Sequence, residues 1–414
     1  MTDPAPAAAG GRRMPGFREF VALIAAMMAI NALSIDAMLP ALPDIGSALN
    51  VPEANDRQWV VTAYLLGFGV MQLVYGPLAD RYGRRPVLLA GLSLYTIFTA
   101  LAAFAWSFEV LVWARVLQGV GAAATRVLAV SIVRDCYSGR TMARVMSLTF
   151  IVFLIAPIIA PSMGQLILLF AHWPWIFGVL AVIGAAITLW AFIRLPETLK
   201  PENRTPISVA GVAGAVKLAL TERLAVGYMM ASTLIVGALF AFITSAQQVF
   251  DQALGRPELF GALFAAVAAG MGLSSYLNSR IVERLGTRRV SHTALIGFIA
   301  FAGAHALVSL AGLETIWTFL LLQGGMMFCF GLVGSNFGSM AMEPLGRIAG
   351  TGSSVQGFVT TVGGASIGFL VGQQFDGTVT PLTISFFLCG VGALLVVLWT
   401  ERGQLFRAHN LPPA

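Results

Sequence analysis

Long apolar runs alternate with short polar segments along almost the whole chain. Twelve runs are present, near residues 19–40, 59–79, 87–107, 109–133, 142–169, 173–195, 224–250, 258–280, 290–311, 315–341, 348–373 and 379–400. A helix needs about 20 apolar residues to cross a bilayer, and each run has roughly that length or more. The pattern predicts an all-α integral membrane protein with twelve transmembrane helices.

A polar stretch, PETLKPENRTPIS at residues 196–208, separates the sixth run from the seventh. We therefore expect two six-helix halves, joined by a central loop. The expected segments are a disordered N-terminus at 1–17, an N-terminal half at 18–195, the central loop at 196–223, a C-terminal half at 224–401 and a tail at 402–414. Residues 1–16 are rich in Ala, Pro and Gly, and no clear signal-peptide cleavage site follows them.

The composition excludes a water-soluble protein. Charged residues make up 11% of the chain and hydrophobic residues 57%, whereas a soluble domain carries about 25% charged residues. The mean hydropathy is +0.83. The three cysteines have no metal-binding spacing, and no nucleotide-binding or hydrolase motif is present. We therefore expect no catalytic residue, no metal and no cofactor, and an ion gradient as the source of energy.

The basic residues concentrate on one side of the predicted membrane. The net charge is +6, but its distribution does not suggest a nucleic-acid partner. When the loops are assigned alternately to two sides, 21 Lys and Arg residues fall on one side and only Arg57 and Arg256 on the other. Basic loops stay in the cytoplasm. We therefore expect both termini and the central loop to be cytoplasmic.

One short turn carries more charge than topology alone requires. GPLADRYGRRP, residues 76–86, follows the second run, and ERLGTRR, residues 283–289, follows the eighth. The two segments share an acid, an arginine, a glycine and a basic pair, and their acids are 203 residues apart. The repetition indicates two structurally related halves, an arrangement common in transporters.

These and further segments resemble the major facilitator superfamily. Residues 76–86 resemble its turn between the second and third helices, and RVLQGVGAAATR (115–126) its fourth-helix motif. APIIAPSMGQ (156–165) resembles its fifth-helix antiporter motif, with Ala156, Ala160 and Gln165 in place of glycines. SIDAMLPALPDI (34–45), IVRDCYSGR (132–140) and AMEPLGRIAGTGSS (341–354) resemble the drug:proton antiporters of the bicyclomycin- and chloramphenicol-resistance type.

The resemblance implies the major facilitator fold and a function. It implies a monomer in the bacterial inner membrane that exports small amphipathic compounds, drugs such as amphenicols, in exchange for protons by alternating access. Two alternatives stay open: proton-coupled transport of a specific metabolite in either direction, and an integral-membrane enzyme or receptor. The second would need a catalytic cluster or a large sensing loop, and the longest loop has only about 28 residues.

The resemblance also assigns a mechanical role to the repeated turn. It implies a conformational latch formed by Gly76, Asp80, Arg81, Gly83 and Arg84. Glycine lets helices approach closely and permits a tight turn, and Asp80 can accept hydrogen bonds from a helix N-terminus or an arginine. The alternative is a turn that only fixes topology.

A second motif lies in the fifth run. Pro157 and Pro161 are expected to break this helix and Gly164 to loosen it, because proline removes an internal hydrogen bond and glycine permits close packing. In the antiporter branch, such a bend would seal the protein against leak.

Two charges inside the apolar runs are candidates for proton coupling. Asp36 lies in the outer half of the first run and Arg115 in the fourth, at similar depth. Charged residues inside membrane spans are costly and usually functional. We expect Asp36 to carry a proton and Arg115 to pair with it. The alternatives are an interfacial, hydrated Asp36 and an Arg115 that reaches the outer headgroups.

Candidate substrate contacts form a second group. Arg126 lies eleven residues after Arg115, close to three helical turns, and therefore on the same face. It could contact an anionic or carbonyl-rich substrate, or instead extend to the cytoplasmic surface or pair with an unidentified group. The other candidates are Gln118, Tyr64, Phe68, Phe240 and Gln247; for each of these, ordinary helix packing is the alternative.

Overall fold

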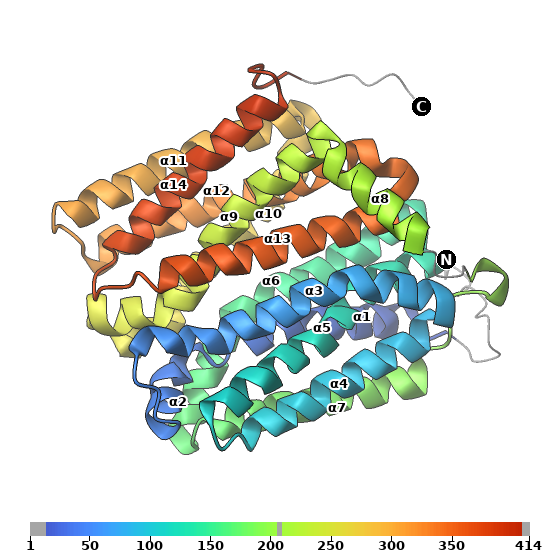
Figure 1. Ribbon diagram of the computed structural model, residues 1–414, viewed down its shortest axis with the longest axis horizontal. Helices are drawn as coiled ribbons and strands as arrows, with labels where there is room; N and C mark the ends of the chain where they lie inside the picture. The colour runs from blue at the N-terminus through green and yellow to red at the C-terminus, as the bar shows by residue number, and fades with distance from the viewer. Residues whose placement is uncertain (1–13, 205–208, 408–414) are drawn as a thin grey trace. The chain divides into compact units, whose positions relative to one another are not determined.

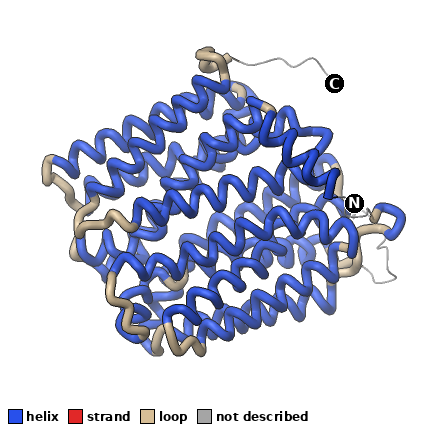
Figure 2. Tube along the Cα trace, in the orientation of Figure 1, coloured by secondary structure: helices blue, strands red, loops and turns tan. Residues whose placement is uncertain are grey.

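The computed structural model describes residues 14–204 and 209–407, and within these ranges it contains helices and loops but no strand (Figure 2). Eleven helices are long and apolar enough to cross a membrane, and α6 is a twelfth long helix of 32 residues. The predicted all-α membrane fold is confirmed. Residues 1–13 of the expected N-terminal segment and 408–414 of the tail lie outside the described ranges.

Each of the twelve apolar runs corresponds to one long helix (Figure 1). The first six are α1 (Phe17–Asp36), α3 (Trp59–Tyr82), α4 (Arg84–Ala103), α5 (Phe108–Cys136), α6 (Gly139–Phe170) and α7 (Pro174–Arg194). The second six are α9 (Arg223–Gln248), α10 (Phe260–Leu285), α11 (Thr287–Leu310), α12 (Ile316–Met342), α13 (Ala349–Gly372) and α14 (Thr380–Thr400).

Two shorter helices were not predicted. The segment after α1 continues as a short 3₁₀ turn and α2 (Leu42–Ala48), and the expected central loop contains α8 (Val209–Thr221). A helix of 13 residues is about 20 Å long, too short to cross the hydrocarbon core. A π-helical turn, Val249–Ala253, also extends α9.

The chain divides into two compact units, Met1–Ala213 and Gly214–Ala414, and both use the same helix packing. In the first unit α5 packs against α3 and α4, α4 against α7, and α1 against α6. In the second unit α12 packs against α10 and α11, α11 against α14, and α9 against α13. The repeat indicated by one turn therefore extends to all six helices of each half.

Glycines bring the helices of the first unit close together. A Cβ atom on Gly67 of α3 would collide with the backbone of Val116, and one on Gly119 of α5 would collide with the backbone of Tyr64. Small residues at helix contacts allow such close approach. The resulting α3–α5 contact places Arg115 beside the start of α3.

The repeated turn has the same backbone conformation in both units. Gly83 separates α3 from α4 with φ of 103°, and Gly286 separates α10 from α11 with φ of 82°. A positive φ is strained for residues with a side chain. At Gly83 a Cβ atom would also collide with the carboxylate of Glu197.

Candidate functional site

Arg115 is the centre of a polar site inside the first unit. Its side chain is fully buried. Nε donates to the carbonyl oxygen of Val60 at 2.7 Å, Nη1 to Oε1 of Gln118 at 2.6 Å and Nη2 to the carbonyl oxygen of Ser34 at 3.0 Å. The guanidinium also lies 4.6 Å from the ring centroid of Tyr64. The arginine therefore joins α1, α3 and α5.

The expected ion pair between Asp36 and Arg115 is not present in this structure. Asp36 is the last residue of α1, its side chain is 3% exposed, and its buried Oδ1 has no hydrogen-bond partner. Arg115 instead binds the carbonyl oxygen of Ser34, in the last turn of α1. The last carbonyls of a helix lack intrahelical partners and form the negative end of its dipole, so they attract a buried cation without a carboxylate.

A chain of side-chain hydrogen bonds surrounds this arginine. Tyr64 donates to Oδ1 of Asn31 at 3.1 Å, and Asn31 donates to the hydroxyl of Thr125 at 2.9 Å. The hydroxyls of Ser34 and Tyr95 are 2.8 Å apart. Sequence analysis did not identify Asn31, Ser34, Tyr95 or Thr125. One signal was available, because Asn31 and Ser34 lie three residues apart, and therefore on one helix face, in a run whose only other polar residue inside its ends is Asp36.

The turn between α3 and α4 forms a second, charged cluster in this unit. Arg84 is 4% exposed and pairs with Asp80 at 2.6 Å and with Asp135 at 3.0 Å. The carboxylate of Glu197, which follows α7, accepts the backbone N–H groups of Arg84 and Arg85 at 2.9 and 3.2 Å. The N-terminus of α4 is therefore capped by Glu197, which was not predicted, while Asp80 binds an arginine as expected.

The other members of the predicted latch make fewer contacts in the first unit. Arg81 is exposed and lies over the ring of Tyr82 at 5.5 Å, and Gly76 is half-buried in α3. The role of these residues in a latch stays a prediction.

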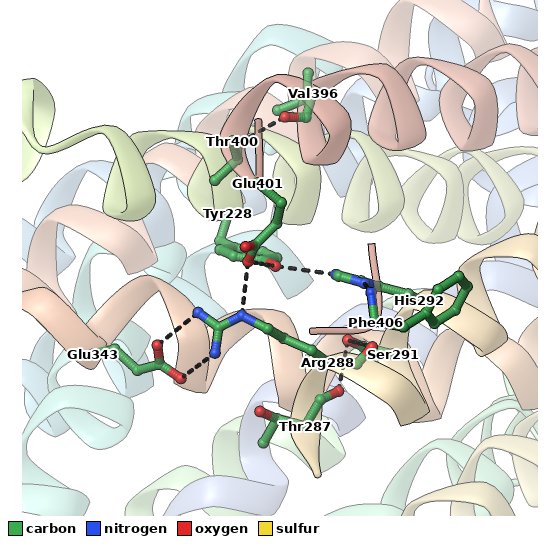
Figure 3. A network of polar contacts seen from close by, with 10 residues as sticks. All are labelled: Tyr228, Thr287, Arg288, Ser291, His292, Glu343, Val396, Thr400, Glu401 and Phe406. Atoms are coloured by element: carbon green, nitrogen blue, oxygen red, sulfur yellow. Dashed lines mark hydrogen bonds and ion pairs between the residues drawn. The ribbon is translucent and has the colours of Figure 1, made fainter. Parts of the chain in front are cut away.

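The second unit contains the equivalent cluster, with additional members (Figure 3). Arg288 of α11 donates to Glu343 at 3.0 Å and to Glu401 at 2.8 Å. Tyr228 donates to the same oxygen of Glu401 at 2.6 Å and lies 3.1 Å from Nε2 of His292. Glu343 follows α12 and Glu401 follows α14, as Asp135 lies at the end of α5 and Glu197 after α7. Glu401 binds the side chain of Arg288, whereas Glu197 binds the backbone N–H groups of Arg84 and Arg85.

His292 connects this cluster to the C-terminal segment. Its Nδ1 accepts the backbone N–H of Phe406 at 3.1 Å. Because the Tyr228 proton is already donated to Glu401, Nε2 must be the donor to the Tyr228 oxygen. This bonding fits the neutral Nε2–H tautomer of His292.

Comparison with known proteins shows the family. The profile described as Major Facilitator Superfamily matches residues 24–369. The chain belongs to the major facilitator superfamily. It is 31% identical to the bicyclomycin resistance protein homolog of Haemophilus influenzae over 93% of this chain and 97% of that protein. It is 26% identical to the multidrug resistance protein MdtL of Escherichia coli over 93% and 96% of the two chains.

A solved structure supports the same fold. The human organic anion transporter MFSD10 (TETRAN) superposes with a TM-score of 0.66 and 17% identity, covering 94% of this chain and 100% of that one. The predicted resemblance to the superfamily and to its bicyclomycin-resistance branch is confirmed. The chain is therefore a multi-pass membrane transporter for a small-molecule substrate.

The six residues predicted to contact substrate lie in both units of the protein. In the first unit Tyr64 and Gln118 are fully buried and contact Arg115. Phe68 is half-buried, and its ring centroid is 6.1 Å from that of Tyr64. Arg126 is exposed. In the second unit Gln247 is buried and donates to Asp251 at 3.2 Å. Phe240 packs near Gly364 and Gly368 of α13. Contact with substrate stays a prediction for all six predicted residues.

The predicted break in the superfamily's fifth transmembrane helix is wrong. α6 is continuous from Gly139 to Phe170 and contains both Pro157 and Pro161. Neighbouring helices can compensate for a missing backbone hydrogen bond in a membrane. Gly164 packs directly against the carbonyl group of Ala37, where a Cβ atom would collide. The glycine therefore brings α6 beside the residue that follows Asp36.

Removing the Glu197 cap tests the first charged cluster. We expect Glu197→Ala to lower the free energy of unfolding by about 1–2 kcal/mol, because helix N-terminal N–H groups lose their acceptor. Thermal unfolding of the detergent-solubilised protein measures the change. The control is Glu202→Ala in the same loop, whose side chain is 72% exposed. Equal melting temperatures for the two variants would contradict a capping role.

Proposed function

We propose that this protein exports small amphipathic compounds, drugs such as amphenicols among them, in exchange for protons by alternating access. Relatives named as bicyclomycin and multidrug resistance proteins support drug efflux. The observation that carries the proton step is the buried Asp36 with an unpartnered Oδ1, at the end of α1 and two residues from a carbonyl bound to Arg115.

Asp36 is a suitable proton carrier because its two charge states favour different contacts. A buried ionised carboxylate without a partner is much less stable than the neutral acid. In the structure the Arg115 guanidinium donates its hydrogen bonds to Ser34, Val60 and Gln118. This arrangement is compatible with a neutral Asp36. Loss of the proton would create an anion that competes with the Ser34 carbonyl for the guanidinium. The predicted Asp36–Arg115 pair then belongs to the deprotonated state.

This competition would couple the protonation state of Asp36 to the position of the last turn of α1. Arg115 holds the last turn of α1 to α5 and the start of α3. A shift of its hydrogen bonds from Ser34 to Asp36 would move that turn, against which Gly164 of α6 packs. We propose that substrate binding and proton release are linked through this movement.

The remaining parts of the proposal concern location. Bacterial relatives support the inner membrane, and the distribution of 21 basic residues on one side against two on the other supports cytoplasmic termini. The protein would work as a monomer, driven by the proton gradient without a cofactor.

The test uses purified protein in liposomes with an imposed pH gradient. Internal pH is recorded while amphenicols, fluoroquinolones and lipophilic cations are added one at a time. We expect at least one compound to trigger proton movement opposite to its own, and Asp36→Asn to abolish this movement while the variant stays folded. Proton and substrate moving in the same direction would identify a symporter. Proton exchange retained in Asp36→Asn would remove Asp36 as the carrier.

A further inference from the structure

Arg126 is an exposed arginine in the interior of a membrane-spanning helix. It is the nineteenth of the 29 residues of α5. Its side chain is exposed, whereas Ala122 and Ala129, one turn before and one turn after it, are fully buried. Among the residues whose side chains the structure describes, none forms a hydrogen bond or ion pair with Arg126. Val130, one turn after Arg126, is 39% exposed, so the exposed part of this face extends from Arg126 toward the C-terminal end of α5.

The direction of Arg126 can be derived from that of Arg115. Eleven residues correspond to three turns plus about 20°, and to a rise of about 16 Å. Arg115 points toward α1 and α3, where it binds Ser34 and Val60. Arg126 thus emerges on the side of α5 where α1 lies, about 16 Å farther along the helix than Arg115.

The charges in the middle of the membrane-spanning helices of the first unit are not balanced. Arg115 binds only neutral acceptors, two backbone carbonyls and an amide oxygen, and Arg126 has no acceptor among the described residues. Asp36 is the one acidic residue in the apolar runs of this half that does not lie at the end of a run. An arginine within a membrane span is stable where it faces water or binds an anion. The surplus positive charge favours an anionic ligand.

We propose that Arg126 binds the negatively charged group of the transported compound, so that the substrates include amphipathic organic anions such as carboxylates. A guanidinium can donate two parallel hydrogen bonds to a carboxylate, which favours this group over an ester or amide. The proposal rests on the proposed function as a transporter of amphipathic compounds and specifies the substrate class.

The first experiment tests whether Arg126 lies at water. In a Cys136→Ser background, Arg126→Cys is treated with a membrane-impermeant methanethiosulfonate reagent. The control is Val182→Cys on α7, an apolar position that is 70% exposed. We expect rapid modification at position 126 and little at position 182. Equal, slow modification at both positions would show that Arg126 faces lipid and would overturn the proposal.

The second experiment tests recognition of the anion. Binding of 2-naphthoate and nalidixate is compared with binding of their methyl esters, by titration calorimetry on the full-length protein. We expect wild type to prefer the acids, and Arg126→Gln to weaken their binding by roughly 10-fold to 100-fold without changing ester binding. Arg126→Lys should keep a weaker preference for the acids, because it keeps the charge but cannot donate two parallel hydrogen bonds. Thermal unfolding checks that the variants are folded.

The outcomes separate this proposal from the proposed function. No preference for acids in wild type, or equal acid affinity in wild type and Arg126→Gln, would overturn the role of Arg126. Amphenicols that drive proton exchange while neither acid binds would also overturn it, but would leave the transport function intact. Failure of every compound in the liposome assay would instead reject the proposed function.

Discussion

Arg115→Ala is expected to abolish transport and to lower the free energy of unfolding by about 3–5 kcal/mol. The substitution would leave the carbonyls of Ser34 and Val60 and the amide oxygen of Gln118 without their donor, all in a buried site. It would also remove a fully buried large side chain. Thermal unfolding measures the stability, and proton-coupled uptake into liposomes measures transport.

Arg115→Lys separates the two effects. Lysine keeps the charge but cannot reproduce the planar fork that reaches three acceptors. We expect a smaller loss of stability and a loss of transport of at least about 100-fold, since the contact between α1 and α5 would be lost. Arg284→Ala, at an exposed position of α10, serves as the control and should behave like wild type. Normal transport by Arg115→Lys would contradict the positioning role.

Arg288→Met is expected to destabilise the protein by about 3–5 kcal/mol. Arg288 is 6% exposed and binds Glu343 and Glu401, and the side chain of Glu401 is itself almost fully buried (Figure 3). Removing the arginine leaves the buried carboxylate of Glu401 without its ion-pair partner. The control is Arg289→Met, at the neighbouring exposed position, where we expect a change within about 0.5 kcal/mol.

A combined variant identifies the cause of this loss. If uncompensated charge is responsible, Arg288→Met with Glu343→Gln and Glu401→Gln should be more stable than Arg288→Met alone, because no buried charge is left unpaired. Lower stability of the triple variant would show that packing, and not charge, makes Arg288 important. Both variants are measured by thermal unfolding under the same conditions.

The helices could be predicted almost completely from the sequence, because spanning helices must be long and apolar. All twelve apolar runs correspond to long helices. The helices α2 and α8 escaped prediction because they are shorter than a span, and such short segments carry no comparable signal. The continuous path of α6 through Pro157 and Pro161 was also missed, since the packing that tolerates proline comes from other helices.

The site was predictable only in part. Asp36 and Arg115 were visible as rare charges in apolar runs. The partners of Arg115 were not, because two of its three acceptors are backbone carbonyls, which every residue has. The contact of Glu197 with Arg84 spans 113 residues and that of Tyr228 with Glu401 spans 173. Such contacts depend on how the helices are assembled.

The central claim is that Asp36 carries the exchanged proton. Proton release on substrate binding tests it most directly, with purified protein in weakly buffered detergent solution and a pH indicator. A compound shown to drive exchange in liposomes is added to wild type and to Asp36→Asn, and its binding is measured in parallel. The account predicts about one proton released per compound bound in wild type, and none in Asp36→Asn although the compound still binds. Equal proton release by both proteins would contradict it.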